Sequence, residues 1–365
     1  MVRQKGLSLV ELMIAITLGL ILMSGVVKVF LSSKTTYSTQ QALSRVQETG
    51  RLAMEFIARD VRMAGYNGCG SRAAGVAVTN TLNNSSSFTW DFNLPIKGYT
   101  SVPTGSTALP TGHGLSPVPY YIASPLVTTD VLTLRGSQGN GIQITQNNNS
   151  GQIFVSQVGS PVTVINGCAD GSSRISGLCQ GDVVMVTDCT KARVFQITNV
   201  TATGSVEVNV VHSNAGTFPP GNALSSWGGN SAPVGEVFGA GSELVTAVSL
   251  TYFIGMGTSG RQSLFQNVNG VNSELLEGVE NMRVLYGEDT TTEEDFVPDI
   301  YSAASAVTDW NRINSVRLEL LVASIEDRVL SEHQTYTFNN GSVTATDYRL
   351  RQVFTSTIAI RNQLF

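Results

Sequence analysis

Charged residues are scarce in this chain of 365 residues. Asp, Glu, Lys and Arg make up 13% of it, against about 25% in an average soluble domain. Lysine and arginine total only 22, and the net charge is −5, so the chain lacks the basic excess of a surface that coats nucleic acid. We therefore expect no direct contact with nucleic acid. Apolar residues make up 42%, which is enough to bury a core and excludes wholesale disorder.

Catalytic motifs are also missing. The sequence has neither a P-loop nor H-E-x-x-H, and His113, His212 and His333 are scattered in polar contexts typical of surface or loop histidines. GMGTSG at 255–260 lacks the crossover helix of a dinucleotide site. GLCQG at 177–181 has the spacing of a nucleophile elbow without the helix that should follow. We predict that the protein is not an enzyme and needs no cofactor.

Long hydrophobic runs are limited to one segment, residues 7–27, which read LSLVELMIAITLGLILMSGVV. As a helix this segment is long enough to cross a bilayer core of about 30 Å. Arg3 and Lys5 precede it and favour a cytoplasmic N-terminus. Because no small-x-small cleavage site follows, as a secretory signal peptide would require, we expect the segment to be retained as a membrane anchor.

One ionisable residue, Glu11, lies inside this run. A carboxylate costs about 2.5–3.5 kcal/mol at the bilayer centre and less near the interface, and a first-turn position is favoured by the helix dipole. A basic leader ends in Gly6, and Glu11 follows five positions later in K5-G6-L7-S8-L9-V10-E11-L12. This N-terminus resembles that of the type IV prepilins.

The resemblance implies processing of the N-terminus. A membrane peptidase would cut between Gly6 and Leu7, and Leu7 would become the N-methylated first residue of the mature chain. Glu11 would then be the fifth residue. An α-amine is mostly cationic at neutral pH, so Glu11 could pair with its own amine or with that of a neighbour, which would relieve the cost of both charges in hydrocarbon.

The helical pattern continues beyond the membrane. Residues 26–63 contain no proline. Among Gln, Arg and Glu, the apolar residues that recur at near-helical spacing are Leu43, Val46, Phe56, Ile57 and Val61. We predict one helix over residues 7–64, about 87 Å long at 1.5 Å per residue, with residues 7–27 in the membrane and Gly65 as its stop.

The rest of the chain, residues 65–365, predicts a β-rich head. Short β-type runs separated by Gly, Asn and Asp turns indicate antiparallel sheet. Residues 1–6 form the leader, residues 79–242 a variable insertion rich in polar loops, and residues 243–365 a C-terminal sheet region. The predicted class is α+β, and the resemblance implies a type IV pilin fold with an enlarged head.

Three further segments narrow the resemblance. ARDVRMAGYNGCG closes the long helix, LLEGVENMRVLYGED lies in the C-terminal region, and INSVRLELLVAS follows Trp310. Together they resemble the PilW minor pilins and the related GspJ-type minor pseudopilins of type II secretion. The middle of the chain resembles no family that we recognise.

Four cysteines all follow the membrane segment: Cys69, Cys168, Cys179 and Cys189. An even number in an extracytoplasmic chain predicts two disulfides, for which three pairings are possible. The spacings fit neither a zinc knuckle nor a CxxC redox pair. We predict Cys168–Cys179, which would close a local loop, and Cys69–Cys189, which would tie the helix end to the sheet.

Acidic residues concentrate between positions 288 and 299. The interpretation as a solvated loop competes with that of a calcium site, because clustered carboxylates suit a hard cation. The candidate ligands are Asp289, Glu293, Glu294 and Asp295, although their spacing does not match an EF-hand.

The resemblance implies a role in type IV pilus assembly. The partners would be other minor pilins, the major pilin, a large tip adhesin, the prepilin peptidase and the assembly platform of the bacterial inner membrane. The head would lie in the periplasm before assembly and at the pilus tip afterwards. Four alternatives remain: a secretion pseudopilin, a pilus component for DNA uptake, an anchored adhesin and an anchored hydrolase.

Overall fold

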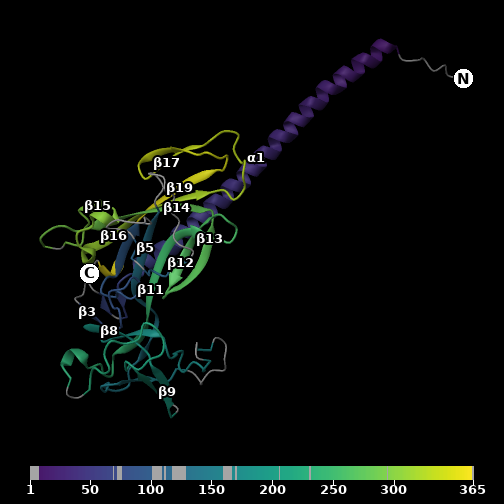
Figure 1. Ribbon diagram of the computed structural model, residues 1–365. Coiled ribbons are helices and arrows are strands. Elements are labelled where there is room, and N and C mark those ends of the chain that lie inside the picture. The colour runs from purple at the N-terminus through teal and green to yellow at the C-terminus, as the bar shows by residue number, and fades with distance from the viewer. Residues whose placement is uncertain are drawn as a thin grey trace.

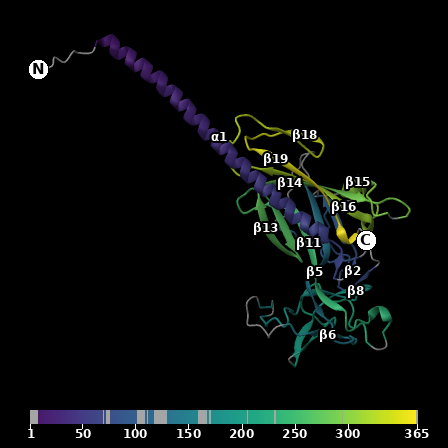
Figure 2. The same ribbon diagram turned by 180° about the vertical axis from the view of Figure 1, so that it is seen from behind.

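A long helix projects from a β-rich head in the computed structural model (Figure 1). The structure describes residues 8–68, 70–71, 76–100, 109–110, 112–116, 129–158, 167–168, 171–204, 206–229, 232–293 and 295–363. The N-terminal end of the helix and the lobe around strand β9 lie at opposite ends of the molecule (Figures 1 and 2). The predicted α+β class, with one long N-terminal helix and a β-rich head, is confirmed.

Helix α1 spans Leu9–Met63, 55 residues without a break. Its first half is exposed, whereas its second half turns a stripe of small and branched residues to the head. The stripe follows the three- and four-residue spacing of one helix face and comprises Ala42, Val46, Gly50, Ala53, Ile57, Ala58, Asp60 and Val61. The helix stops at the predicted place. Gly65 has a φ of +75°, and its N–H donates to the carbonyl of Arg135 over 2.8 Å.

A four-stranded antiparallel sheet receives this stripe (Figure 2). Its order is β15 (Ile300–Ser302), β14 (Val279–Glu288), β16 (Ile313–Ala323) and β19 (Arg351–Ala359). The hairpin of β17 (Thr335–Phe338) and β18 (Gly341–Thr344) follows β16. One continuous core joins the helix stripe to β14, β16 and β19 and to parts of the second sheet. The helix and this sheet therefore fold as one unit.

The second sheet has eight strands. Its main path is β13 (Val271–Glu277), β12 (Gln262–Val268), β11 (Glu243–Met256), β7 (Val183–Thr187), β8 (Lys191–Gln196) and β3 (Ala77–Asn80). Strand β5 (Asp130–Gln143) pairs with β11 and with β4 (Ile96–Thr100). Strands from both sides of the boundary predicted at 242/243 thus share one sheet. The pairing of β3 with β8 is parallel, which the long connection between them permits; no strand was predicted at the position of β3.

A smaller lobe lies at the end farthest from the tip of α1 (Figure 1). It contains the three-stranded sheet of β6 (Gln152–Ser156), β10 (Glu207–Val211) and β9 (Asn199–Thr203). Its core is separate from that of the helix and contains Phe195, Trp227 and Phe238. Short elements complete the head: strands β1 (Tyr66–Asn67) and β2 (Gly70–Ser71), and the 3-10 turns η1 (Val234–Glu236), η2 (Ala304–Ala306), η3 (Trp310–Arg312) and η4 (Arg361–Gln363).

Candidate functional site

The first turn of α1 holds the residue that the sequence singles out, Glu11. Its carboxylate accepts hydrogen bonds from the N–H of Ser8 over 3.0 Å and from the Ser8 hydroxyl over 3.2 Å. In return, the N–H of Glu11 donates to the Ser8 hydroxyl oxygen over 3.3 Å. This is a capping box, and it holds the carboxylate at the positive end of the helix dipole. Gly6 and Leu7 lie outside the described residues, so their cleavage and methylation stay predictions.

The half of α1 that follows Glu11 is apolar and makes no contact with the head. Large apolar side chains from Leu9 to Leu31 are exposed all around it, and α1 is the one described helix that is long and apolar enough to cross a membrane. The hydroxyls of Thr17 and Ser24 donate to carbonyls of the preceding turn over 2.8–3.0 Å. These hydroxyls are therefore hydrogen-bonded without water, as a lipid environment requires of polar groups. Apolar surface of this extent indicates lipid or another protein as its cover.

The other half of α1 docks closely on the head at Gly50. A Cβ atom built on Gly50 would overlap the ring of Phe354 in β19. The absence of a side chain therefore lets the helix backbone approach the strand, the close contact for which glycine is suited.

A buried hydrogen-bond cluster fixes the last turns of α1. The Tyr252 hydroxyl in β11 donates to the Asp60 carboxylate over 2.6 Å and accepts from Gln266 Nε2 over 2.8 Å. Arg59 Nε lies 3.0 Å from the other Asp60 oxygen. Burial, together with the hydrogen bond to Asp60, raises the pKa of Tyr252 well above its usual range. The cluster was not predicted from the sequence, although a carboxylate within the apolar stripe of the helix is a signal for it.

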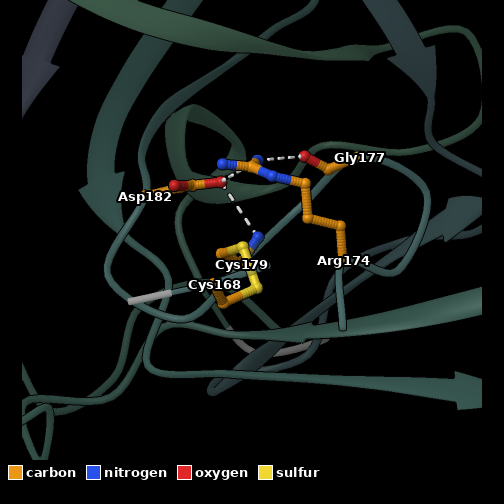
Figure 3. The surroundings of a disulfide bond; sticks show 5 residues. All are labelled: Cys168, Arg174, Gly177, Cys179 and Asp182. Carbon is orange, nitrogen blue, oxygen red and sulfur yellow. Dashed lines mark hydrogen bonds and ion pairs between the residues drawn. A yellow bond between two sulfur atoms is a disulfide. The ribbon is translucent and has the colours of Figure 1, made fainter. Parts of the chain in front are cut away.

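The disulfide Cys168–Cys179, one of the two predicted, is present in the distal lobe (Figure 3). Its Cα atoms are 5.4 Å apart. Asp182 Oδ2 accepts from the Cys179 N–H over 2.9 Å and lies 3.6 Å from the Arg174 guanidinium. Cys69 lies outside the described residues, and Cys189 is not a free thiol, so the pairing of Cys69 with Cys189 stays a prediction.

Removing this disulfide by the double substitution Cys168→Ser and Cys179→Ser should destabilise the distal lobe. The bond closes a loop with a sequence separation of 11, for which the loop-entropy account gives about 3 kcal/mol. Urea unfolding followed by tryptophan fluorescence checks the loss, and Cys168→Ser and Cys179→Ser alone, which each break the same bond, should lose a similar amount of stability. A midpoint equal to that of the wild type would contradict the expected stabilisation.

The acidic segment at residues 288–299 forms hydrogen bonds within the chain. Asp289 accepts hydrogen bonds from Thr291 Oγ1 over 2.6 Å and from the N–H groups of Asp295 and Phe296 over 3.0 Å. The hydrogen bond from Thr291 is the main cause that lowers the pKa of Asp289. The described residues contain no group of three or more His, Cys, Asp or Glu placed to hold a metal ion, and Glu294 lies outside them. We therefore propose no calcium site.

His212 is a fully buried residue, so its interpretation as a surface or loop histidine was wrong. Its ring stacks on Trp227 with centroids 4.1 Å apart and meets Phe195 edge-on. Arg193 lies over the Trp227 ring and pairs with Glu236 over 3.3 Å. Burial, with a smaller contribution from the Arg193 charge, lowers the pKa of His212 to about 4. The ring therefore serves as a neutral core aromatic, which a polar sequence context does not reveal.

Acidification from pH 6.5 to pH 4 should destabilise the distal lobe through His212. Its pKa is about 4 in the folded state and about 6.5 in the unfolded state, so the unfolded chain binds the proton first. The contribution to stability is complete above pH 6.5 and decreases by up to about 3 kcal/mol as the pH falls to 4.

The contrast between wild type and His212→Phe isolates this effect. Burial raises the pKa of Asp130 to about 6, which favours the folded state as the pH falls, but this contribution is common to both proteins and cancels. Urea unfolding at pH 7, 5 and 4 should show a smaller decline for His212→Phe. Equal declines would contradict the prediction.

The chain matches two family models at its two ends. Residues 251–362 match PilW, the type IV pilus-assembly protein W, and residues 1–27 match the prokaryotic N-terminal methylation motif. No curated protein and no solved structure matches. The PilW match runs from within β11 to η4 and so includes the whole sheet on which α1 docks. The predicted resemblance is confirmed: the C-terminal region is similar to the type IV pilus-assembly protein PilW, and the N-terminus carries the methylation motif of a prepilin.

Proposed function

We propose that this prepilin is a minor pilin of a type IV pilus. The peptidase cuts between Gly6 and Leu7, Leu7 is methylated, and the mature chain enters a tip or priming complex that starts filament assembly. The observation that carries the proposal is the two-part helix α1, whose first half is apolar and uncovered and whose second half is packed into the head. Because this complex starts filament assembly, piliation, twitching motility and adhesion depend on the protein.

Assembly exchanges one apolar environment for another. The first half of α1 lies in the inner membrane before assembly, with the head in the periplasm, and packs against other pilin helices in the filament afterwards. Hydrophobic burial is therefore similar in both states, and helix packing and polar contacts select the partner. Glu11 pairs with an α-amine, because each of these charges alone is costly in an apolar medium.

The partners follow from this arrangement. The helix contacts the major pilin and other minor pilins, while the head of 65–365 selects its neighbours and connects to a large tip adhesin. The prepilin peptidase and the inner-membrane assembly platform act on the chain before it enters the filament. The negative net charge does not favour direct binding to DNA.

A clean deletion of the gene in the source organism tests the proposal. We expect the loss of most surface pili by electron microscopy and of twitching motility, with both restored by the wild-type gene in trans. Exoprotein secretion, measured in the same strain, should be unchanged. Normal piliation would contradict the proposal, and loss of secretion alone would assign the chain to a type II secretion pseudopilus.

A further inference from the structure

Strand β19 forms one edge of the four-stranded sheet and pairs on one side only, with β16. In an antiparallel pair, the residues whose N–H and C=O groups point to the partner strand alternate with residues whose groups point away. Ile360, just after the strand, donates its N–H to the Asn314 carbonyl of the β16 side over 2.9 Å. The even-numbered residues therefore face β16, and the odd-numbered residues of β19 direct their backbone groups to the open edge.

The first of these odd-numbered residues is already capped by a side chain. The Arg351 N–H donates to Gln334 Oε1 over 2.7 Å, and the Arg351 carbonyl accepts from Gln334 Nε2 over 2.8 Å. The amide of Gln334 thus forms the two hydrogen bonds that a neighbouring strand would form. This cap confirms that the N–H and C=O groups of the odd-numbered residues point away from β16. The cap covers Arg351 and no later residue of β19. Among the described residues, the outward backbone groups of Val353, Thr355 and Thr357 have no hydrogen-bond partner.

A groove runs between this open edge and α1. Thr355 and Ser356 line it on the strand, and Met54, Ala58 and Phe354 provide its apolar lining. Arg51, Glu55 and Arg62 of α1 also line it, and neither arginine forms an ion pair with another described residue. A strand added at the edge would direct alternate side chains into this groove. The two arginines outnumber Glu55, so the groove favours an acidic side chain close to Arg51 or Arg62.

We propose that an extended segment of a different protein adds to β19 as a fifth strand. Its backbone pairs with Val353, Thr355 and Thr357, one apolar side chain contacts Met54 and Phe354, and a flanking carboxylate pairs with Arg51 or Arg62. Natural sheets normally protect such an edge by short length, charge, proline or a covering element. Among the described residues, Gln334 caps the backbone of Arg351, and β17 lies close to β19 without pairing with it. Strand addition is an established mode of peptide recognition.

Site-specific photo-crosslinking in cells of the source organism tests this surface. A benzophenone side chain replaces Thr357, which is exposed, in the full-length chain. Irradiation should give one adduct, and peptide mapping should place it in an extended segment of another envelope protein that carries an acidic residue. The same photoprobe at Val206, an exposed residue of the distal lobe, is the positional control and should not give that adduct.

Two pairs of variants show whether the adduct depends on strand pairing. Thr355→Pro removes the outward N–H, and proline is tolerated on an edge strand, so the adduct should fall about tenfold with the loss of a backbone hydrogen bond and of close approach. Thr355→Ala keeps the N–H and should keep the adduct. Arg51→Glu should lower the yield of the adduct although it leaves the sequence of β19 unchanged, whereas Arg51→Lys should leave the yield unchanged. The amount and melting temperature of each variant in membrane extracts establish folding.

Several outcomes would overturn the inference. They are the absence of an adduct at position 357, an adduct that maps to a helix or to a second copy of this chain, and an adduct unaffected by both Thr355→Pro and Arg51→Glu in folded protein. The inference does not depend on the proposed pilus role, because the crosslink is scored by the segment captured and not by piliation.

Discussion

Substituting Glu11 by alanine should remove the protein from assembled pili and leave its head folded. In the proposed assembly, Glu11 neutralises an α-amine inside an apolar helix bundle, and breaking a buried charge pair costs about 3–5 kcal/mol because one charge remains uncompensated. A cost near 3 kcal/mol corresponds to a decrease of about a hundredfold in equilibrium incorporation. Immunoblots of sheared pili against membrane fractions measure the distribution of the chain.

The head provides the internal control for this substitution. Glu11 lies in the exposed half of α1, and the described residues place its carboxylate only against Ser8. The melting temperature of the head in detergent should therefore match that of the wild type. Glu11→Gln, which keeps the hydrogen-bonding oxygen and removes the charge, should also fail to assemble. Glu48→Ala changes an exposed glutamate of the same helix and should assemble normally.

Two results would contradict this role of Glu11. Normal incorporation of Glu11→Ala would show that the carboxylate is a tolerated first-turn residue stabilised by the helix dipole. Normal incorporation of Glu11→Gln, with loss only in Glu11→Ala, would indicate that the capping hydrogen bonds with Ser8 matter and that the charge does not.

Substituting Gly50 by leucine should loosen the helix from the head. The new side chain would overlap the ring of Phe354, and overpacking a well-packed core typically costs 1–3 kcal/mol. The gain in helix propensity offsets about 0.8 kcal/mol of this cost. We expect a net loss of about 2 kcal/mol and a fall of several degrees in melting temperature, measured on the full-length chain in detergent.

Gly25→Leu is the matched control for this prediction. A Cβ atom at Gly25 has nothing within 4 Å, so the same substitution in the same helix gains propensity without a clash. Its melting temperature should equal or exceed that of the wild type. Equal values for Gly50→Leu and Gly25→Leu would contradict the close docking of α1 on β19. A compensating substitution, Phe354→Ala, should recover part of the loss in the Gly50→Leu background.

Local patterns predicted the parts of the fold in which neighbours in sequence are neighbours in space. Helical periodicity predicted Val46, Ile57 and Val61 of the helix stripe, whereas Leu43, predicted by the same spacing, is exposed. Gly65 marks the helix end because its positive φ suits glycine. The Cys168–Cys179 bond joins residues within one short loop. The apolar run and Glu11 are likewise local features, and they predicted the prepilin resemblance.

Features that depend on distant pairing could not be predicted in this way. The contact between Asp60 and Tyr252 joins residues 192 positions apart, and no local pattern specifies that register. The burial of His212 depends on Trp227 and Phe195 arriving from other segments. The open edge of β19 is visible only once the strand order is known. The candidate site was thus predictable at its N-terminal end and unpredictable where the head meets the helix.

The intact mass of the protein extracted from wild-type membranes and from sheared pili tests the central claim most directly. Processing of the prepilin predicts a chain of residues 7–365 with one added methyl group, and fragmentation should locate that methyl on the Leu7 amine. A peptidase-deficient strain should yield the unprocessed chain as the reference mass. An unmodified mass for residues 1–365 in wild-type cells, in both fractions, would contradict the claim.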